Sequence, residues 1–84
     1  MIETPLLRTI LRNVGEEVER AQAKFPPFNS GHEGYAVIKE ELDELWDHVK
    51  GNTAYSPAAM IEAQQVAAMG VRYMLMVAQK GYQK

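Results

Sequence analysis

The sequence predicts an all-α fold in which three main helices form a helical bundle. Apolar residues recur at steps of three and four along three segments, and a cap residue followed by proline begins two of these segments. No segment has the pattern of a convincing strand. At 84 residues the chain fits a single domain, 1–84, with helices expected over about 4–24, 31–50 and 57–79.

The first segment has clear start and stop signals. Thr4 is a suitable N-cap, and Pro5 follows at the first helical position. Pro26 and Pro27 end the helix, because proline has no N–H to donate to the helical ladder. Between these signals one face of the helix is apolar, with Leu6, Leu7, Ile10, Leu11, Val14, Val18 and Ala21.

The second and third segments carry the same kind of signals. Ser30 with Glu33 three residues later forms a capping box, so the second helix should begin near residue 31. The pair Gly51–Asn52 ends it, since both residues tolerate a left-handed backbone. Ser56–Pro57 then repeats the cap-and-proline start, and the third helix should run to a point shortly before Gly81.

Composition excludes several classes of protein. The formal net charge of −2 provides no general basic field for nucleic acid, and the absence of Cys excludes disulfides, thiolate zinc sites and a Cys nucleophile. The longest apolar-rich run, 66–78, contains Arg72 and is shorter than the ~20 residues that span a bilayer. The start of the chain lacks the pattern of a signal peptide. We therefore expect a cytoplasmic protein with no membrane or nucleic-acid partner.

Small size predicts self-association. A core built from 84 residues supplies little net stability, and the third helix is apolar or small around nearly its whole circumference. We therefore expect oligomerisation, as a homodimer or a homotetramer, to complete the bundle.

Acidic residues recur beside the predicted helix seams. On the second helix Ile38, Leu42, Leu45 and Val49 form the expected apolar stripe, while Glu40, Asp43 and Asp47 point to water. Glu41 and Glu44 lie on a shoulder of this stripe, and Glu62 and Gln65 have the same spacing on the third helix. Two such pairs of oxygen ligands could hold Mg²⁺. The alternative is a solvated acidic surface, which is what we expect for Glu16, Glu17 and Glu19.

These motifs resemble a known family. Glu40-Glu41-x-x-Glu44, followed after 17 residues by Glu62-x-x-Gln65, resembles the Glu-Glu-x-x-Glu and Glu-x-x-Asp signature of the MazG-like all-α nucleoside triphosphate pyrophosphohydrolases. The phrases at 28–35, 40–46 and 62–69 are also similar to those of small single-domain members, and the resemblance covers roughly 25–78. Gln65 departs from the signature, which has Asp at this position.

The resemblance implies a dimer-based helical bundle that binds Mg²⁺, or Mn²⁺, and cleaves a nucleoside triphosphate to a monophosphate and pyrophosphate. It implies that Glu41, Glu44 and Glu62 are metal ligands and catalytic residues, and that Glu40 is an additional acidic group of the catalytic site. Gln65 would offer an uncharged amide oxygen in place of the fourth carboxylate.

Other side chains are candidates for substrate contacts. Lys39, Arg72 and Lys80 could contact phosphates, and Asn29 and His32, in the connector before the second helix and at its start, could contact the base or sugar. For each of them the alternative is an ordinary solvated surface residue.

A second function fits the same sequence. Gln65 favours a catalytically inactive helical module for oligomerisation or partner binding that retains the acidic motif, whereas Glu41, Glu44 and Glu62 favour the enzyme. Release of pyrophosphate from nucleotides with and without Mg²⁺ separates these hypotheses.

Overall fold

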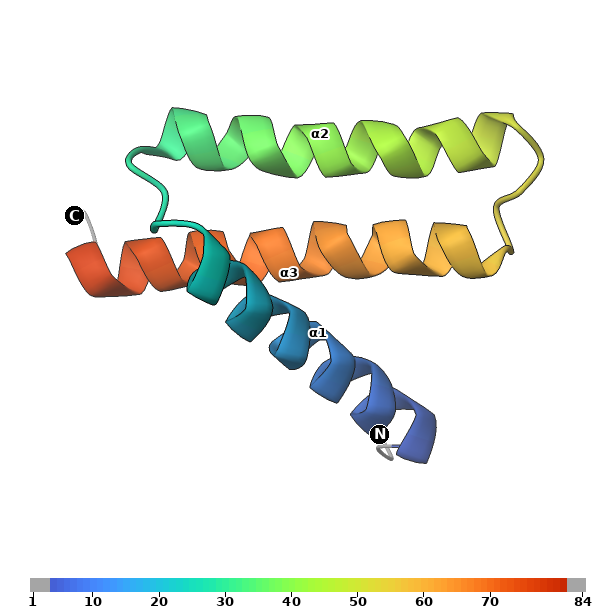
Figure 1. Ribbon diagram of the computed structural model, residues 1–84, viewed down its shortest axis with the longest axis horizontal. Helices are drawn as coiled ribbons and strands as arrows, with labels where there is room; N and C mark the ends of the chain where they lie inside the picture. Colours follow the sequence, from blue (N-terminus) through green and yellow to red (C-terminus); the bar gives the residue numbers. More distant parts are fainter. Residues whose placement is uncertain (1–3, 82–84) are drawn as a thin grey trace.

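The computed structural model describes residues 4–81 as three helices: α1 (Pro5–Lys24), α2 (Gly31–Lys50) and α3 (Pro57–Lys80). The all-α prediction is confirmed, with no strand in this range. Figure 1 shows α2 and α3 as antiparallel neighbours, while α1 crosses α3 and its N-terminal half points away from the pair. Positions 1–3 and 82–84 of the expected domain lie outside the described residues.

The three helix starts lie where the sequence predicts them. The side-chain oxygens of Thr4, Ser30 and Ser56 each accept a hydrogen bond of 3.1 Å from the backbone N–H three residues later. The capping box differs in one detail, because the Glu33 carboxylate accepts from the N–H of Asn29 at 2.8 Å. α3 ends one residue later than predicted, and Gly81 follows it with a φ of 83°.

The core lies where the C-terminal half of α1 crosses α3. Val14, Val18 and Ala21 of α1 are buried there together with Phe28 of the connector. α3 contributes three buried residues to this cluster, Ala68, Met69 and Met76. The connector therefore helps to hold α1 against α3, since Phe28 fills the space at the end of the crossing.

The predicted apolar stripe of α2 is right for Ile38 and Leu45, which pack inward, and wrong for Leu42 and Val49, which are 50% and 44% exposed. The reason is a close approach at Gly34. A Cβ atom there would lie 2.6 Å from the ring of Tyr73 and 3.0 Å from the ring of Phe28. Because α2 presents its glycine side to α3, residues further along on that side also turn inward, and those two and three turns beyond Gly34 are the acidic residues Glu41 and Glu44.

No helix within residues 4–81 has the length and apolar character needed to cross a membrane.

Substitution by alanine should have opposite effects on stability at the buried Gly34 and at the exposed Gly15. Gly34→Ala should destabilise the fold by about 1–3 kcal/mol, because two aromatic rings must shift to admit the methyl group. Gly15→Ala in α1 is the matched control: its Cβ meets nothing within 4 Å, so the substitution should stabilise by about 0.4–1 kcal/mol. Urea unfolding of both variants measures the difference. Equal effects would show that the approach of α2 to α3 is loose.

Candidate metal centre

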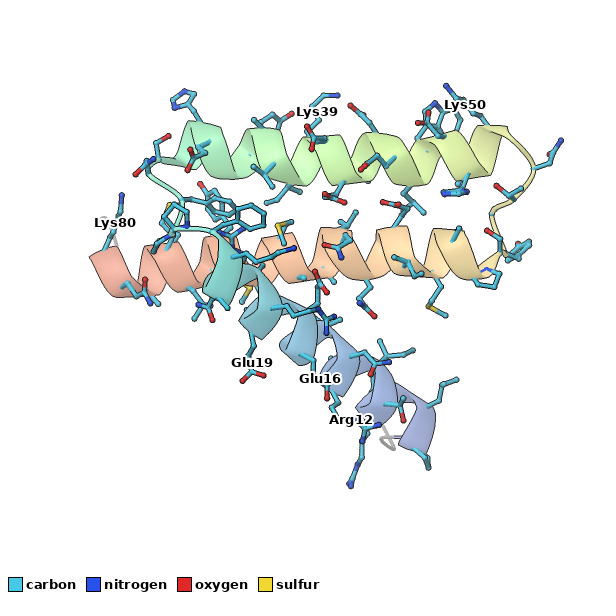
Figure 2. All side chains as sticks on the ribbon, in the orientation of Figure 1. Arg12, Glu16, Glu19, Lys39, Lys50 and Lys80 are labelled. Carbon is cyan, nitrogen blue, oxygen red and sulfur yellow. The ribbon has the colours of Figure 1, made fainter. Side chains whose placement is uncertain are left out.

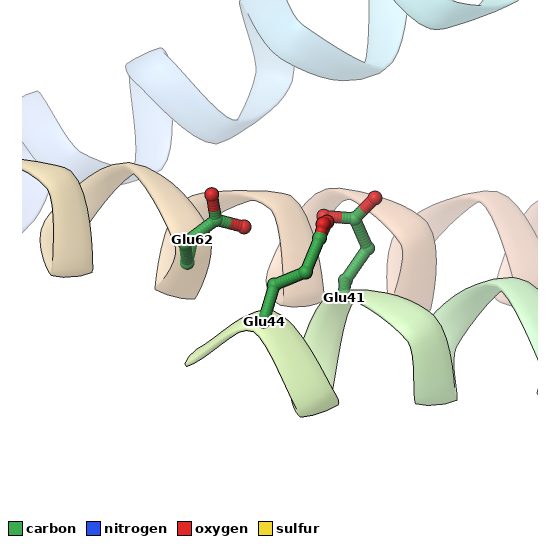
Figure 3. Close-up of side chains that lie close together, drawn as sticks. All are labelled: Glu41, Glu44 and Glu62. Carbon is green, nitrogen blue, oxygen red and sulfur yellow. The ribbon is translucent and has the colours of Figure 1, made fainter. Parts of the chain in front are cut away.

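Three carboxylates from two helices meet between α2 and α3. Glu41 and Glu44 are one helical turn apart on α2, and Glu62 faces them from α3 (Figure 3). One carboxylate oxygen from each residue lies within 4.8 Å of the others, and all three residues are half-buried. Two oxygens bound to the same cation at 2.0–2.6 Å can be at most about 5 Å apart. The trio Glu41, Glu44 and Glu62 can therefore share one hard divalent cation after a small adjustment.

The electrostatics of the trio favour a cation. Burial raises the pKa of the Glu41 carboxyl, and the charges of Glu44 and Glu62 raise it further. The pKa of Glu44 is also raised, first by desolvation and then by the charge of Glu62. No lysine or arginine of residues 4–81 forms an ion pair with the trio. The three acids thus repel one another without internal compensation, a condition that a bound cation relieves.

A groove of about 530 Å³ begins beside Glu41 and runs between the three helices. Its lining combines acidic, basic and aromatic side chains. It is formed by Glu17, Arg20, Ala21, Lys24, Phe25, Pro26, Phe28, Glu33, Val37, Glu40, Glu41, Gln65, Met69 and Arg72. The candidate metal centre is therefore open, on one side, to a space of the size that small ligands occupy.

Gln65 lies in this groove and contacts α1. Its side chain hydrogen-bonds the Glu17 carboxylate, which lowers the pKa of Glu17, and a hydrogen bond from Arg20 lowers this pKa further. The Arg20 Nε donates to Glu17 at 2.9 Å, and the Glu17 side chain is only 15% exposed. The expectation of solvated charges is confirmed for Glu16 and Glu19 (Figure 2) and wrong for Glu17.

Glu17 is a groove residue that the sequence did not single out, as are Arg20 and Lys24. Its position could have indicated burial, because Glu17 follows Val14 by three residues and precedes Ala21 by four. Both of these apolar residues are in the core. A glutamate on the core side of an amphipathic helix is the same signal that singled out Glu41 and Glu44 on α2.

Arg72 is buried at 8% exposure, so the alternative of a solvated charge is wrong for this residue. Its Nη2 donates to the Pro26 carbonyl oxygen at 2.9 Å, and its Nη1 lies 3.6 Å from the Met69 sulfur. The guanidinium carbon is 4.4 Å from the centroid of the Phe28 ring, a cation–π contact. These contacts hold the guanidinium in the wall of the groove.

The other predicted substrate residues lie outside the groove. Lys39 donates to the Asp43 carboxylate at 3.0 and 3.1 Å, on the side of α2 that faces away from α3 (Figure 2). His32 and Asn29 are exposed, and the carbonyl oxygen of Asn29 accepts a hydrogen bond of 3.1 Å from Lys80. Glu40 is exposed and lines the groove next to Glu41. Roles for Asn29, His32 and Lys39 in substrate binding stay predictions.

Comparisons with protein-family models, with curated proteins and with solved structures find no match to this chain. The resemblance of its acidic motifs to the MazG-like family therefore stays a prediction.

The repulsion within the trio should appear in the pH dependence of stability. The pKa values of Glu41 and Glu44 are raised above 4.5 in the folded protein. In the pH range just above 4.5 the folded protein therefore binds more protons than the unfolded chain. Stability should therefore fall as the pH rises through this range. Glu41→Gln should weaken this dependence and raise the melting temperature at pH 7, measured in a chelator.

Added Mg²⁺ supplies the second half of this test. It should raise the melting temperature of the parent protein at pH 7, because a cation that binds only the folded state stabilises it. It should not raise that of Glu41→Gln. Identical pH profiles and identical responses to Mg²⁺ would show that the three acids do not interact.

Proposed function

We propose that this protein is a Mg²⁺-dependent hydrolase of nucleoside triphosphates that releases a monophosphate and pyrophosphate, as the resemblance to the MazG-like family implies. The observation that carries the proposal is the convergence of Glu41, Glu44 and Glu62, without compensating cations, at the edge of a groove. Hard carboxylate oxygens are the ligands that Mg²⁺ prefers, and Mn²⁺ accepts the same set. These three residues would hold the cation.

The charges of the site suit a polyphosphate. A nucleoside triphosphate brings about four negative charges, and a carboxylate-lined site accepts it only together with divalent cations. When bound, the cation would neutralise phosphate oxygens and lower the pKa of a water molecule. This chemistry needs no protein nucleophile, in keeping with a chain that has no Cys.

The proposed reaction gives roles to two further groove residues, Glu40 and Gln65. Water attacks the α-phosphorus, the bond from this phosphorus to the α–β bridging oxygen breaks, and the pyrophosphate leaves with that oxygen. Glu40, exposed in the groove lining beside Glu41, would accept the proton of the water. Gln65 lines the groove with Glu17 and lowers the pKa of the Glu17 carboxyl by hydrogen bonding.

A helical interaction module is the second candidate, and exposed apolar surface favours it. Leu6 and Leu11 in the projecting half of α1 are 69% and 57% exposed. On α2, Trp46 is 56% exposed beside Leu42 and Val49. Such surface is typical of a chain that associates with another. Association with a second copy is compatible with the enzyme, so this surface alone does not separate the two functions.

The enzyme hypothesis is tested by matched substitutions on and away from the trio. Glu62→Gln should lower Mg²⁺-dependent release of pyrophosphate by more than about 10–100-fold. That is the loss seen when a residue that only hydrogen-bonds a metal ligand is removed, whereas Glu62 would bind the metal itself. Asp43→Asn is the control, because Asp43 is exposed and bonded to Lys39 on the opposite side of α2. A panel of nucleoside triphosphates provides the substrates. Comparable small effects at both positions, or no release by the parent protein, would favour the interaction module.

Association is tested by light scattering. We expect a mass of two or four chains at micromolar concentration, because burial of the exposed leucines offsets the small size of the core. Leu11→Glu should shift the population to monomers, whereas Ala23→Glu adds the same charge at an exposed small residue and should not. A parent protein that stays monomeric would contradict the expected homodimer or homotetramer.

A further inference from the structure

Arg72 is a buried cation that has no carboxylate partner. It is 8% exposed and forms no ion pair with any acidic residue of the described range. Its hydrogen-bond acceptors, the Pro26 carbonyl and the Met69 sulfur, carry no net charge. Burial of an uncompensated charge is costly, and chains of this size have little stability to spare. A neutral side chain would fill the same space at lower cost, so the charge itself calls for an explanation.

The groove explains the buried charge of Arg72, because other positively charged side chains also line it. Lys24, at the end of α1, and Arg20, one turn earlier, line the same groove. Arg20 is engaged by Glu17, whereas Lys24 forms no ion pair in residues 4–81. Glu33 also lines the groove, but its carboxylate is engaged by the backbone of Asn29. Arg72 and Lys24 thus form a basic end of the groove whose charge is available to an anion.

The distance from the trio to this basic end suits an extended anion. Arg72 follows Glu62 by ten residues, about 15 Å along the axis of α3. Long helical side chains lean toward the helix N-terminus, and the contact with Met69 shows that Arg72 does so. The guanidinium therefore lies near the level of residue 69, about 10 Å along the axis from Glu62. A single phosphate bound at the trio does not reach this far, but a chain of phosphates does.

We propose that Arg72 and Lys24 bind the terminal phosphate of a polyphosphate chain whose inner phosphates lie at the trio. The inference rests on the proposed function, because the cation at the trio orients the chain along the groove. Binding of this kind would make the protein selective for triphosphates over monophosphates. Only a triphosphate is long enough to contact both the trio and the basic end of the groove. One face of the Phe28 ring carries the guanidinium of Arg72 and so holds this positive charge in the groove wall, where its remaining N–H groups can donate to a phosphate.

Calorimetric titration with inorganic triphosphate tests the basic end without a nucleoside. Ca²⁺ serves as the cation, because it takes the same oxygen ligands. Lys24→Gln and Arg72→Lys should each weaken triphosphate binding about tenfold or more, since each removes charge-assisted hydrogen bonds. The affinity for Ca²⁺ alone should not change. Lys50→Gln is the control: it removes one positive charge at the far end of α2, where Lys50 pairs with Asp47 at 3.2 Å (Figure 2).

The outcomes separate this inference from the proposed function. Triphosphate binding that is unchanged in both variants overturns the inference, even if the parent protein hydrolyses nucleotides. Weaker binding of ATP with unchanged binding of inorganic triphosphate also overturns it, because the basic end then contacts the nucleoside. Weaker triphosphate binding in a protein that hydrolyses no nucleotide supports the basic end and contradicts the proposed function. Lys24 is exposed, so Lys24→Gln decides the matter if Arg72→Lys fails to fold.

Discussion

The contact of Gly34 with the rings of Tyr73 and Phe28 is the constraint on which the rest of the structure depends. The two rings pack directly against the backbone of Gly34, and a single methyl group there would collide with both of them. The contact sets the rotation of α2 about its axis. Glu41 and Glu44 lie on the same side of the helix, two and three turns further along. The packing of a glycine near one end of the helix therefore turns two carboxylates toward α3.

The same rotation has a cost elsewhere in the chain. It leaves Leu42, Trp46 and Val49 exposed and puts two glutamates where apolar residues would be more stable. A sequence selected only for a well-packed pair of helices would interchange these positions. Rules of local patterning are broken in natural proteins mainly where a site requires it. The inward acids of α2 are the side chains that the proposed cation would use, and its outward apolar residues are the surface that the proposed association would cover.

The parts of this structure that depend on neighbours in sequence were predictable, and the parts that depend on distant contacts were not. The caps at Thr4, Ser30 and Ser56 act over three residues, so helix starts follow directly from the sequence. The shoulder position of Glu41 and Glu44 was correct, but the exposure of Leu42 was not, because it depends on Tyr73, about thirty residues away. The burial of Arg72 likewise depends on Pro26 and Phe28 in the connector. The helical periodicity of α3 does not predict contacts with these distant residues.

Gln65 shows how the charge of the site is linked to the position of α1. A carboxylate at this position would face Glu17 across the groove and would add a fourth negative charge near the trio. The amide instead lowers the pKa of Glu17 by hydrogen bonding, whereas an aspartate would repel the Glu17 carboxylate. Glu17 of α1 and Gln65 of α3 therefore form a contact between two helices in the groove, which an acid at position 65 would weaken.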